Sequence, residues 1–268
     1  MVCIPPAEMD TLTTEALKEL TGAMENLFID GKYTDLTVSC QDDTYRVHKA
    51  IICNQCSFFA KACDGGFKEA NTNEINLVED ESCAVQAMFQ FLYTCTYSDK
   101  VSFVEGADLV CEMSLHIKVY ALADKYDIPG LKAHALDRFD KQVKAEFPKE
   151  IPSFSKFKHA VQEIYTTTPH TDRDLRDIVV ALAAQYSKEL FGSEVGFAKM
   201  MDDVGEFGKD LSEYMSSKWV ITGDLTPKKY TCPECTRIFV TQMVAGRNWC
   251  SGCGEAKTEE NWAPYAAN

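Results

Sequence analysis

The sequence predicts an α+β domain, followed by an all-helical segment and a small β unit built on a cysteine cluster. Short alternating strand patterns between residues 36 and 77 give way to apolar stripes with helical spacing. Helical spacing alone continues to about residue 215, and four of the twelve cysteines gather between positions 232 and 253. We therefore expect domains at residues 9–135, 136–220 and 228–258, with Pro148 and Pro152 near the first boundary.

The composition is that of a globular chain. Of its 268 residues, 46% are apolar and 25% are charged, which excludes collagen, coiled coil and wholesale disorder. The longest purely apolar run, residues 178–184, is far shorter than the roughly 20 residues of a membrane span. The first residues carry no basic and apolar secretory pattern. We expect an intracellular protein of the nucleus or the cytoplasm, without membrane contact.

The net charge of −14 is unevenly spread along the chain. Residues 228–268 hold five basic and four acidic side chains, a net +1, so residues 1–227 carry a net −15. An acidic body repels phosphate backbones. Nucleic acid binding is therefore not expected of this body, while the C-terminal segment is at least neutral.

The first elements alternate between helix and strand. Residues 9–28 carry an apolar stripe at helical spacing that includes Leu17 and Leu20, and Gly31 marks its end. Residues 36–40 alternate as a strand, a turn at 41–43 follows, and the alternation resumes at residue 45. These features predict a β-hairpin that packs on helices.

The following elements are a short strand and then helices. Residues 74–77 read as a strand, and apolar stripes over 85–92 and 115–122 predict two helices. Residues 171–174 resemble a capping box, and helical spacing then runs from 175 to 190. A further helix is expected from Phe197 to Met215.

Five segments occur in the order and spacing of a known family. They are Tyr33-Thr34-Asp35-Leu36-Thr37-Val38, Tyr45-Arg46-Val47-His48-Lys49-Ala50-Ile51-Ile52-Cys53, Ser57-Phe58-Phe59-Ala60, Phe89-Gln90-Phe91-Leu92-Tyr93-Thr94 and Ala121-Leu122-Ala123-Asp124-Lys125-Tyr126. Together they resemble a BTB/POZ domain over residues 9–135, and the whole layout is similar to BTB proteins of filamentous fungi. The resemblance implies a protein-interaction module that lacks catalysis.

The resemblance also implies partner-binding positions. Asp35 and Lys49 correspond to residues that line a charged pocket at the dimer groove of some family members. The alternative is an ordinary ion pair that fixes the first strand to the following helix. A homodimer is expected to pack through helices, since Pro5 and Pro6 disfavour an exchanged N-terminal strand.

BTB adaptors that recruit a cullin ubiquitin ligase often carry an apolar-x-acidic motif before the Ala-Asp-Lys-Tyr-like stretch. Counting back from Tyr126 places Leu115, His116 and Ile117 there, where the acidic residue is missing. Phe103-Val104-Glu105 has the pattern but lies about a dozen residues too early. The missing acidic residue counts against a cullin as partner, and if one binds, Leu115, His116 and Ile117 are its predicted contact.

The C-terminal cysteines predict a zinc ribbon. Cys232-Pro-Glu-Cys235 and Cys250-Ser-Gly-Cys253 are two C-x-x-C knuckles, and 14 residues lie between them. All five histidines lie upstream of them, so four thiolates are expected to hold one structural Zn²⁺ with no open position for catalysis. A strand is expected at residues 237–240 and a turn at 246–248.

Two roles remain open for this ribbon. It is a structural staple for about 40 residues, or it is a docking surface for protein or nucleic acid. Bases could stack on four aromatic side chains beside basic ones, namely Tyr230, Phe239, Trp249 and Trp262, with Lys228, Lys229, Arg237 and Arg247. Its basic residues are too few to favour nucleic acid.

Enzymatic chemistry has little support in the sequence. No nucleophile elbow, dinucleotide fingerprint, P-loop or H-E-x-x-H motif is present. A third C-x-x-C, Cys53 to Cys56, is interpreted as core packing, with redox or metal chemistry as the alternative. We therefore predict a non-enzymatic interaction protein, in its sharper form an adaptor for a cullin ligase. The alternative is a transcriptional or chromatin regulator whose ribbon contacts nucleic acid.

Overall fold

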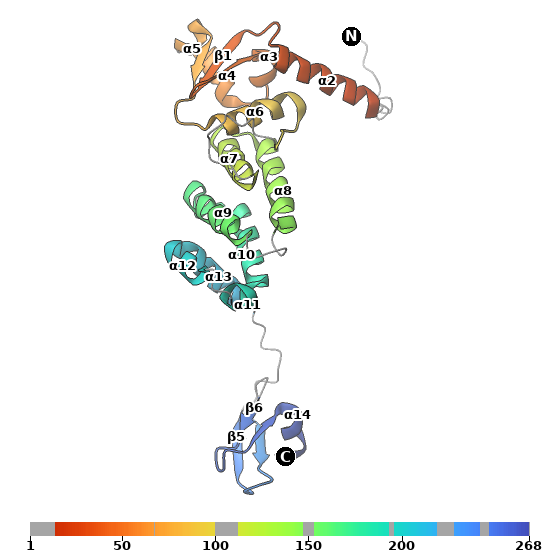
Figure 1. Ribbon diagram of the computed structural model, residues 1–268, viewed down its shortest axis with the longest axis vertical. Helices are drawn as coiled ribbons and strands as arrows, with labels where there is room; N and C mark the ends of the chain where they lie inside the picture. Colours follow the sequence, from red (N-terminus) through yellow and green to blue (C-terminus); the bar gives the residue numbers. More distant parts are fainter. Residues whose placement is uncertain are drawn as a thin grey trace. The chain divides into compact units, whose positions relative to one another are not determined.

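A computed structural model describes residues 14–66, 68–99, 112–146, 153–192, 196–218, 228–241 and 247–267. The chain divides into two compact units, residues 1–214 and 215–268 (Figure 1). The three domains expected from the sequence thus correspond to two units, because the helical segment packs into the same core as the first domain. The boundary expected at 135–136 falls inside one helix, Pro129–Glu146.

The first unit begins with helix α2 (Thr14–Asp30) and a three-stranded sheet of order β2-β1-β3. Strand β1 (Leu36–Cys40) pairs antiparallel with β2 (Asp43–Val47) and parallel with β3 (Glu74–Asn76). Alternate residues of β1 are buried, because successive side chains of a strand point to opposite faces. The predicted hairpin and the strand near residue 75 are confirmed.

Helices cover this sheet and continue beyond it (Figure 1). They are α3 (Lys49–Ile52), α4 (Ser57–Asp64), α5 (Lys68–Thr72), α6 (Ser82–Thr94), α7 (Glu112–Lys125) and α8 (Pro129–Glu146). Helix α7 is buried almost all round, because it packs against α6, α8 and α9. It therefore lies at the centre of the unit.

Five further helices complete the unit: α9 (Ser153–Thr167), α10 (Asp174–Gln185), α11 (Ser187–Gly192), α12 (Phe197–Asp203) and α13 (Gly205–Lys218). The helix expected from 197 to 215 is interrupted at Val204. The capping-box prediction was wrong, since Arg173 occupies the N-cap without a side-chain cap. The carboxylate of Asp172 instead accepts hydrogen bonds from Tyr120 Oη (2.7 Å) and Lys132 Nζ (2.8 Å), which join this loop to α7 and α8.

The second unit contains strands β4 (Lys228–Thr231), β5 (Ile238–Thr241), β6 (Arg247–Trp249), β7 (Ala256–Thr258) and β8 (Ala266–Ala267), with helix α14 (Glu259–Trp262) and a 3₁₀ turn, η1 (Ala263–Tyr265). The sheet has the order β5-β4-β8, and β6 pairs with β7. The turn expected at 246–248 was wrong for Arg247 and Asn248, which pair with β7; Gly246 lies outside the described residues. The unit extends past residue 258 because Trp262 is fully buried in it.

Among the described residues, no helix combines the length and the apolar character that crossing a membrane requires.

Candidate functional site

Four cysteine sulfurs converge in the second unit. The Sγ atoms of Cys232, Cys235, Cys250 and Cys253 all lie within 4.8 Å of one another. Two of the separations are 3.6 Å, between Cys232 and Cys253, and 3.7 Å, between Cys235 and Cys250. A tetrahedral ion with Zn–S bonds of about 2.3 Å requires sulfurs about 3.8 Å apart. The donor set and its spacing thus fit a tetrahedral metal ion.

The two knuckles that present these sulfurs have the same backbone hydrogen bonds. Cys232 N–H donates to the carbonyl of Arg237 (3.0 Å), and Thr236 N–H donates to that of Cys232 (2.9 Å). Cys250 N–H likewise donates to the carbonyl of Glu255 (2.8 Å), and Gly254 N–H to that of Cys250 (3.0 Å). Each C-x-x-C segment is thereby folded into a tight turn that directs two thiols to one point.

Both turns need a residue with positive φ after the second cysteine. Thr236 takes this position at 58° and Gly254 at 77°. Gly252 serves a different purpose, since a Cβ at this position would lie 2.8 Å from Arg237 Cδ and 3.3 Å from Cys235 Sγ. The two glycines thus allow the second knuckle to form for different reasons, Gly254 through its positive φ and Gly252 through its missing side chain.

Electrostatics favour a cation at this point. Hydrogen bonds from the backbone N–H groups of Cys253 and Gly252 lower the pKa of the Cys250 thiol to about 7. The backbone N–H of Glu255 acts to lower the pKa of Cys253, but burial and hydrogen bonds with the other three cysteines outweigh it and raise that pKa to about 12. Four thiolates within 4.8 Å of one another would repel each other strongly without a positive charge between them. The cluster can therefore hold a metal as a closed four-sulfur site, and it leaves no position for a reacting molecule.

The aromatic residues of this unit divide between core and surface. Tyr230 and Trp262 are buried, and Trp262 Nε1–H donates to the carbonyl of Asn248 at 3.0 Å. Trp249 is 62% exposed. The side chain of Phe239 lies outside the described ones. Of the described aromatics proposed to stack on bases, Tyr230 and Trp262 are therefore core residues.

Asp35 and Lys49 lie close together but do not pair through their charges. Asp35 Oδ1 accepts a hydrogen bond from the backbone N–H of Lys49 at 2.8 Å. The ammonium of Lys49 donates to Asn73 Oδ1 at 2.5 Å instead. Asp35 thus supports the start of α3, and Lys49 ties α3 to the segment before β3. Asp35 is exposed, which leaves its carboxylate accessible.

Leu115, His116 and Ile117 are buried on α7, with exposed fractions of 1%, 2% and 0%. His116 Nδ1 lies 2.8 Å from Tyr97 Oη. This burial counts against the predicted partner contact, since these side chains offer no surface to another protein. Phe103, Val104 and Glu105 lie outside the described residues.

The Cys53–Cys56 pair has the character of core thiols. Burial raises the pKa of Cys56, whose Sγ–H donates to the carbonyl of Tyr126 at 3.4 Å. Burial also raises the pKa of Cys53 to about 12. Neither thiol favours the thiolate that redox or metal chemistry requires.

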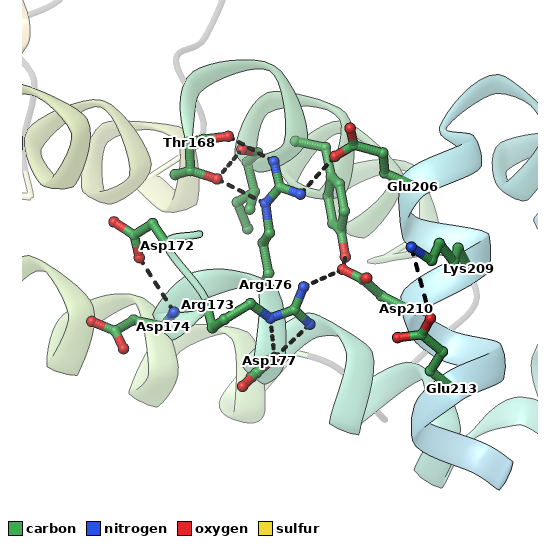
Figure 2. Close-up of polar contacts among 12 residues, drawn as sticks. Thr168, Asp172, Arg173, Asp174, Arg176, Asp177, Glu206, Lys209, Asp210 and Glu213 are labelled. Carbon is green, nitrogen blue, oxygen red and sulfur yellow. Dashed lines mark hydrogen bonds and ion pairs between the residues drawn. The ribbon is translucent and has the colours of Figure 1, made fainter. Parts of the chain in front are cut away.

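One polar cluster was not anticipated from the sequence. In Figure 2, Arg173 at the N-cap of α10 and Arg176 in its first turn point toward Asp210 and Glu206 of α13. The nitrogen–oxygen distance is 2.7 Å both from Arg173 to Asp210 and from Arg176 to Glu206. Arg176 is only 3% exposed, and it also donates to the hydroxyl and the carbonyl of Thr168. The acidic residues have the i, i+4 spacing of one helix face, but that pattern does not identify a partner helix.

Comparison with known proteins matches the first unit. The profile of the BTB/POZ domain family matches residues 24–143. Rho-related BTB domain-containing protein 2 of Mus musculus is 24% identical over 116 residues, 41% of this chain and 15% of that protein. Zinc finger and BTB domain-containing protein 44 of Mus musculus is 27% identical over 81 residues, 30% of this chain and 18% of that protein. The solved BTB domain of zebrafish PATZ1 matches over 53% of this chain and 99% of its own, at 11% identity and a TM-score of 0.36.

Proposed function

Residues 24–143 form a BTB/POZ domain. We propose that the chain is a non-enzymatic interaction module that self-associates through helix α2. The chain spans less than a fifth of the length of Rho-related BTB domain-containing protein 2 and of zinc finger and BTB domain-containing protein 44.

The observation that carries this proposal is the apolar stripe of α2. Met24 and Leu27 pack against the core of the unit, while Leu17 and Leu20, on the same helix face, are 51% and 56% exposed. The first part of α2 extends away from the helices that cover the sheet (Figure 1). A second copy of the same helix would cover both leucines, as the isologous interface of a twofold dimer requires.

Sedimentation of the full chain tests this interface. The double variant Leu17→Asp with Leu20→Asp places charges within the stripe, and it is expected to convert a dimer to a monomer. Ile29→Asp is the matched control, because Ile29 lies on another face of α2 and is 70% exposed. A wild-type monomer, or a dimer that survives the double variant, would contradict the proposal.

For the second unit we propose one structural Zn²⁺ held by Cys232, Cys235, Cys250 and Cys253. The sulfur spacing supports this choice. A bound ion would supply folding energy that the small described core, Tyr230 and Trp262 beside two of the cysteines, lacks. The described cysteines are all free thiols, which supports an intracellular protein of the nucleus or cytoplasm. Zinc content by elemental analysis tests the assignment, with one ion per chain expected.

A narrower proposal is that the module is a substrate adaptor for a cullin ubiquitin ligase. Its test is capture of a cullin N-terminal domain by the full chain. Because Leu115 is buried, Leu115→Ala would report on folding as well as binding. A chain that is folded and zinc-loaded but captures no cullin would reject this version while leaving self-association in place.

The alternative proposal is a regulator whose ribbon contacts nucleic acid. Trp249 is the described ribbon tryptophan that is exposed, and Lys229 and Arg237 are exposed with it. This proposal expects DNA or RNA binding that weakens steeply with salt and is lost in Trp249→Ala. Absence of binding at low salt would exclude it.

A further inference from the structure

Strand β5 is an edge strand of the second unit and carries no charged residue. Among the described strands, the sheet order is β5-β4-β8, so β5 has a neighbour on one side alone. Its sequence is Ile-Phe-Val-Thr. Natural sheet edges are protected by charges, proline or bulges, because an open edge is a template for another strand. None of these protections occurs within β5.

The phase of the β4–β5 ladder shows which backbone groups face the open edge. Cys232 N–H donates to the carbonyl of Arg237, so this pair is hydrogen-bonded. The register continues as Thr231 with Ile238, Tyr230 with Phe239 and Lys229 with Val240. Hydrogen-bonded and non-hydrogen-bonded pairs alternate in an antiparallel ladder. The N–H and C=O groups of Ile238 and Val240 therefore point away from β4.

The side chains of the same two residues are also exposed. Ile238 is 63% exposed and Val240 is 60% exposed, and both lie on one face of the strand. Open backbone groups and exposed β-branched side chains thus coincide at the same positions. This combination is what a strand offers to another strand, since backbone bonds provide affinity and side-chain pairs provide register.

We infer that β5 pairs antiparallel with β5 of a second copy of this chain, about a twofold axis at Phe239. In this register Ile238 faces Val240 of the partner subunit, and each such pair exchanges two backbone hydrogen bonds. The pairing is symmetric, as an isologous contact requires.

The charges near β5 favour a second copy of this chain as the partner strand. In the symmetric register Arg237 lies opposite Thr241 of the partner subunit, so no like charges face each other along the strand. Lys229, the basic residue opposite Val240 on β4, is one strand further from the axis. The inference rests on the proposed self-association in one respect, since a dimer of the first unit would raise the local concentration of two ribbons.

NMR-detected hydrogen exchange of the zinc-loaded full chain tests this pairing. In an unpaired ribbon the Phe239 amide is protected by β4, while the Ile238 and Val240 amides are open. In the paired ribbon all three are protected, and the Ile238 and Val240 amides exchange within about tenfold of Phe239. Amides of Ile238 and Val240 that exchange freely beside a protected Phe239 would overturn the inference.

Substitutions at Val240 provide a matched pair. Val240→Pro removes the backbone N–H that points away from β4 and leaves every β4–β5 hydrogen bond in place. The ribbon is therefore expected to keep its zinc, while hydrogen exchange of the Ile238 amide accelerates about tenfold or more. Val240→Thr keeps the donor and the branched shape, and exchange should stay as in wild type. If the Val240→Pro variant does not retain zinc, the variant Ile238→Lys is used in its place. It is expected to accelerate hydrogen exchange of the Val240 amide. Unchanged protection in a zinc-loaded disrupting variant would contradict strand pairing.

Measured masses separate this inference from the proposed function. A dimer with open Ile238 and Val240 amides overturns the strand pairing alone. A monomer at all concentrations overturns the self-association through α2, and the strand pairing with it.

Discussion

At the scale of single residues, the metal site depends on the absence of a side chain at position 252. A Cβ there would lie 3.3 Å from Cys235 Sγ and 2.8 Å from Arg237 Cδ. Arg237 can move, but the sulfur cannot move without leaving its position in the tetrahedron. We expect Gly252→Ala to weaken zinc affinity by about tenfold, or about 1.4 kcal/mol, in a chelator competition assay. Ser251→Ala, at an exposed neighbouring position, should bind zinc as wild type does. Equal affinity of both variants would contradict this account.

His116 provides a second prediction at this scale, and it concerns stability against pH. Burial, aided by Arg138 and His134 and opposed by Asp99, lowers the pKa of His116 to about 4. The unfolded chain, with a histidine pKa of about 6.5, then binds the proton more readily than the folded chain. The contribution of His116 to the free energy of unfolding is therefore largest above pH about 6.5. It falls as the pH drops toward about 4 and changes no further below that.

Urea unfolding of wild type and His116→Gln measures this contribution. The wild type should lose on the order of 2–3 kcal/mol more than the variant between those two pH values. His170→Gln is the control, because His170 is exposed. Parallel pH profiles for wild type and His116→Gln would contradict the assignment.

At the scale of elements, α13 is held to α9 and α10 by a buried charge with unequal partners (Figure 2). The Arg176 side chain is 3% exposed and that of Glu206 is 63% exposed. The guanidinium also lies 4.3 Å from the centre of the Tyr165 ring. Arg176→Met would leave the carbonyl of Thr168 without this buried donor, and we expect a loss of about 3 kcal/mol in the free energy of unfolding. Glu206→Gln should cost less than about 1 kcal/mol, because its carboxylate stays in contact with water. Equal losses in urea unfolding would contradict this picture.

The elements also show what the sequence could and could not predict. The hairpin, the strand near residue 75 and the helices around 88 and 119 followed from local periodicity. The capping box failed because Asp172 pairs with Tyr120 and Lys132, residues about 40 to 50 positions earlier. The break at Val204 carried no proline signal. Local spacing does not reveal contacts made over such separations.

The candidate sites also differ in how well the sequence predicted them. The four cysteines were predicted correctly as one cluster, since two C-x-x-C turns need only local geometry to present their sulfurs. Leu115, His116 and Ile117 were chosen by counting along the chain, and α7 turned out to be enclosed by three helices. An apolar stripe does not reveal whether the opposite face of the helix is also covered.

At the scale of the whole molecule, two units carry separate tasks. The first unit has a large apolar core and an exposed apolar stripe on α2. In the described part of the second unit, the core consists of Tyr230 and Trp262 with two of the four clustered cysteines, Cys232 and Cys250. A chain organised in this way is expected to associate through the first unit and to depend on metal for the second. Both properties appear in the mass of the intact assembly.

Native mass spectrometry of the full chain therefore tests the central claim most directly. The account predicts a species of twice 30.0 kDa that carries two zinc ions, one for each cysteine cluster. The Leu17→Asp, Leu20→Asp variant should give a monomer with one zinc ion. A wild-type chain that remains monomeric would contradict self-association through α2, and a dimer without zinc would contradict the metal site.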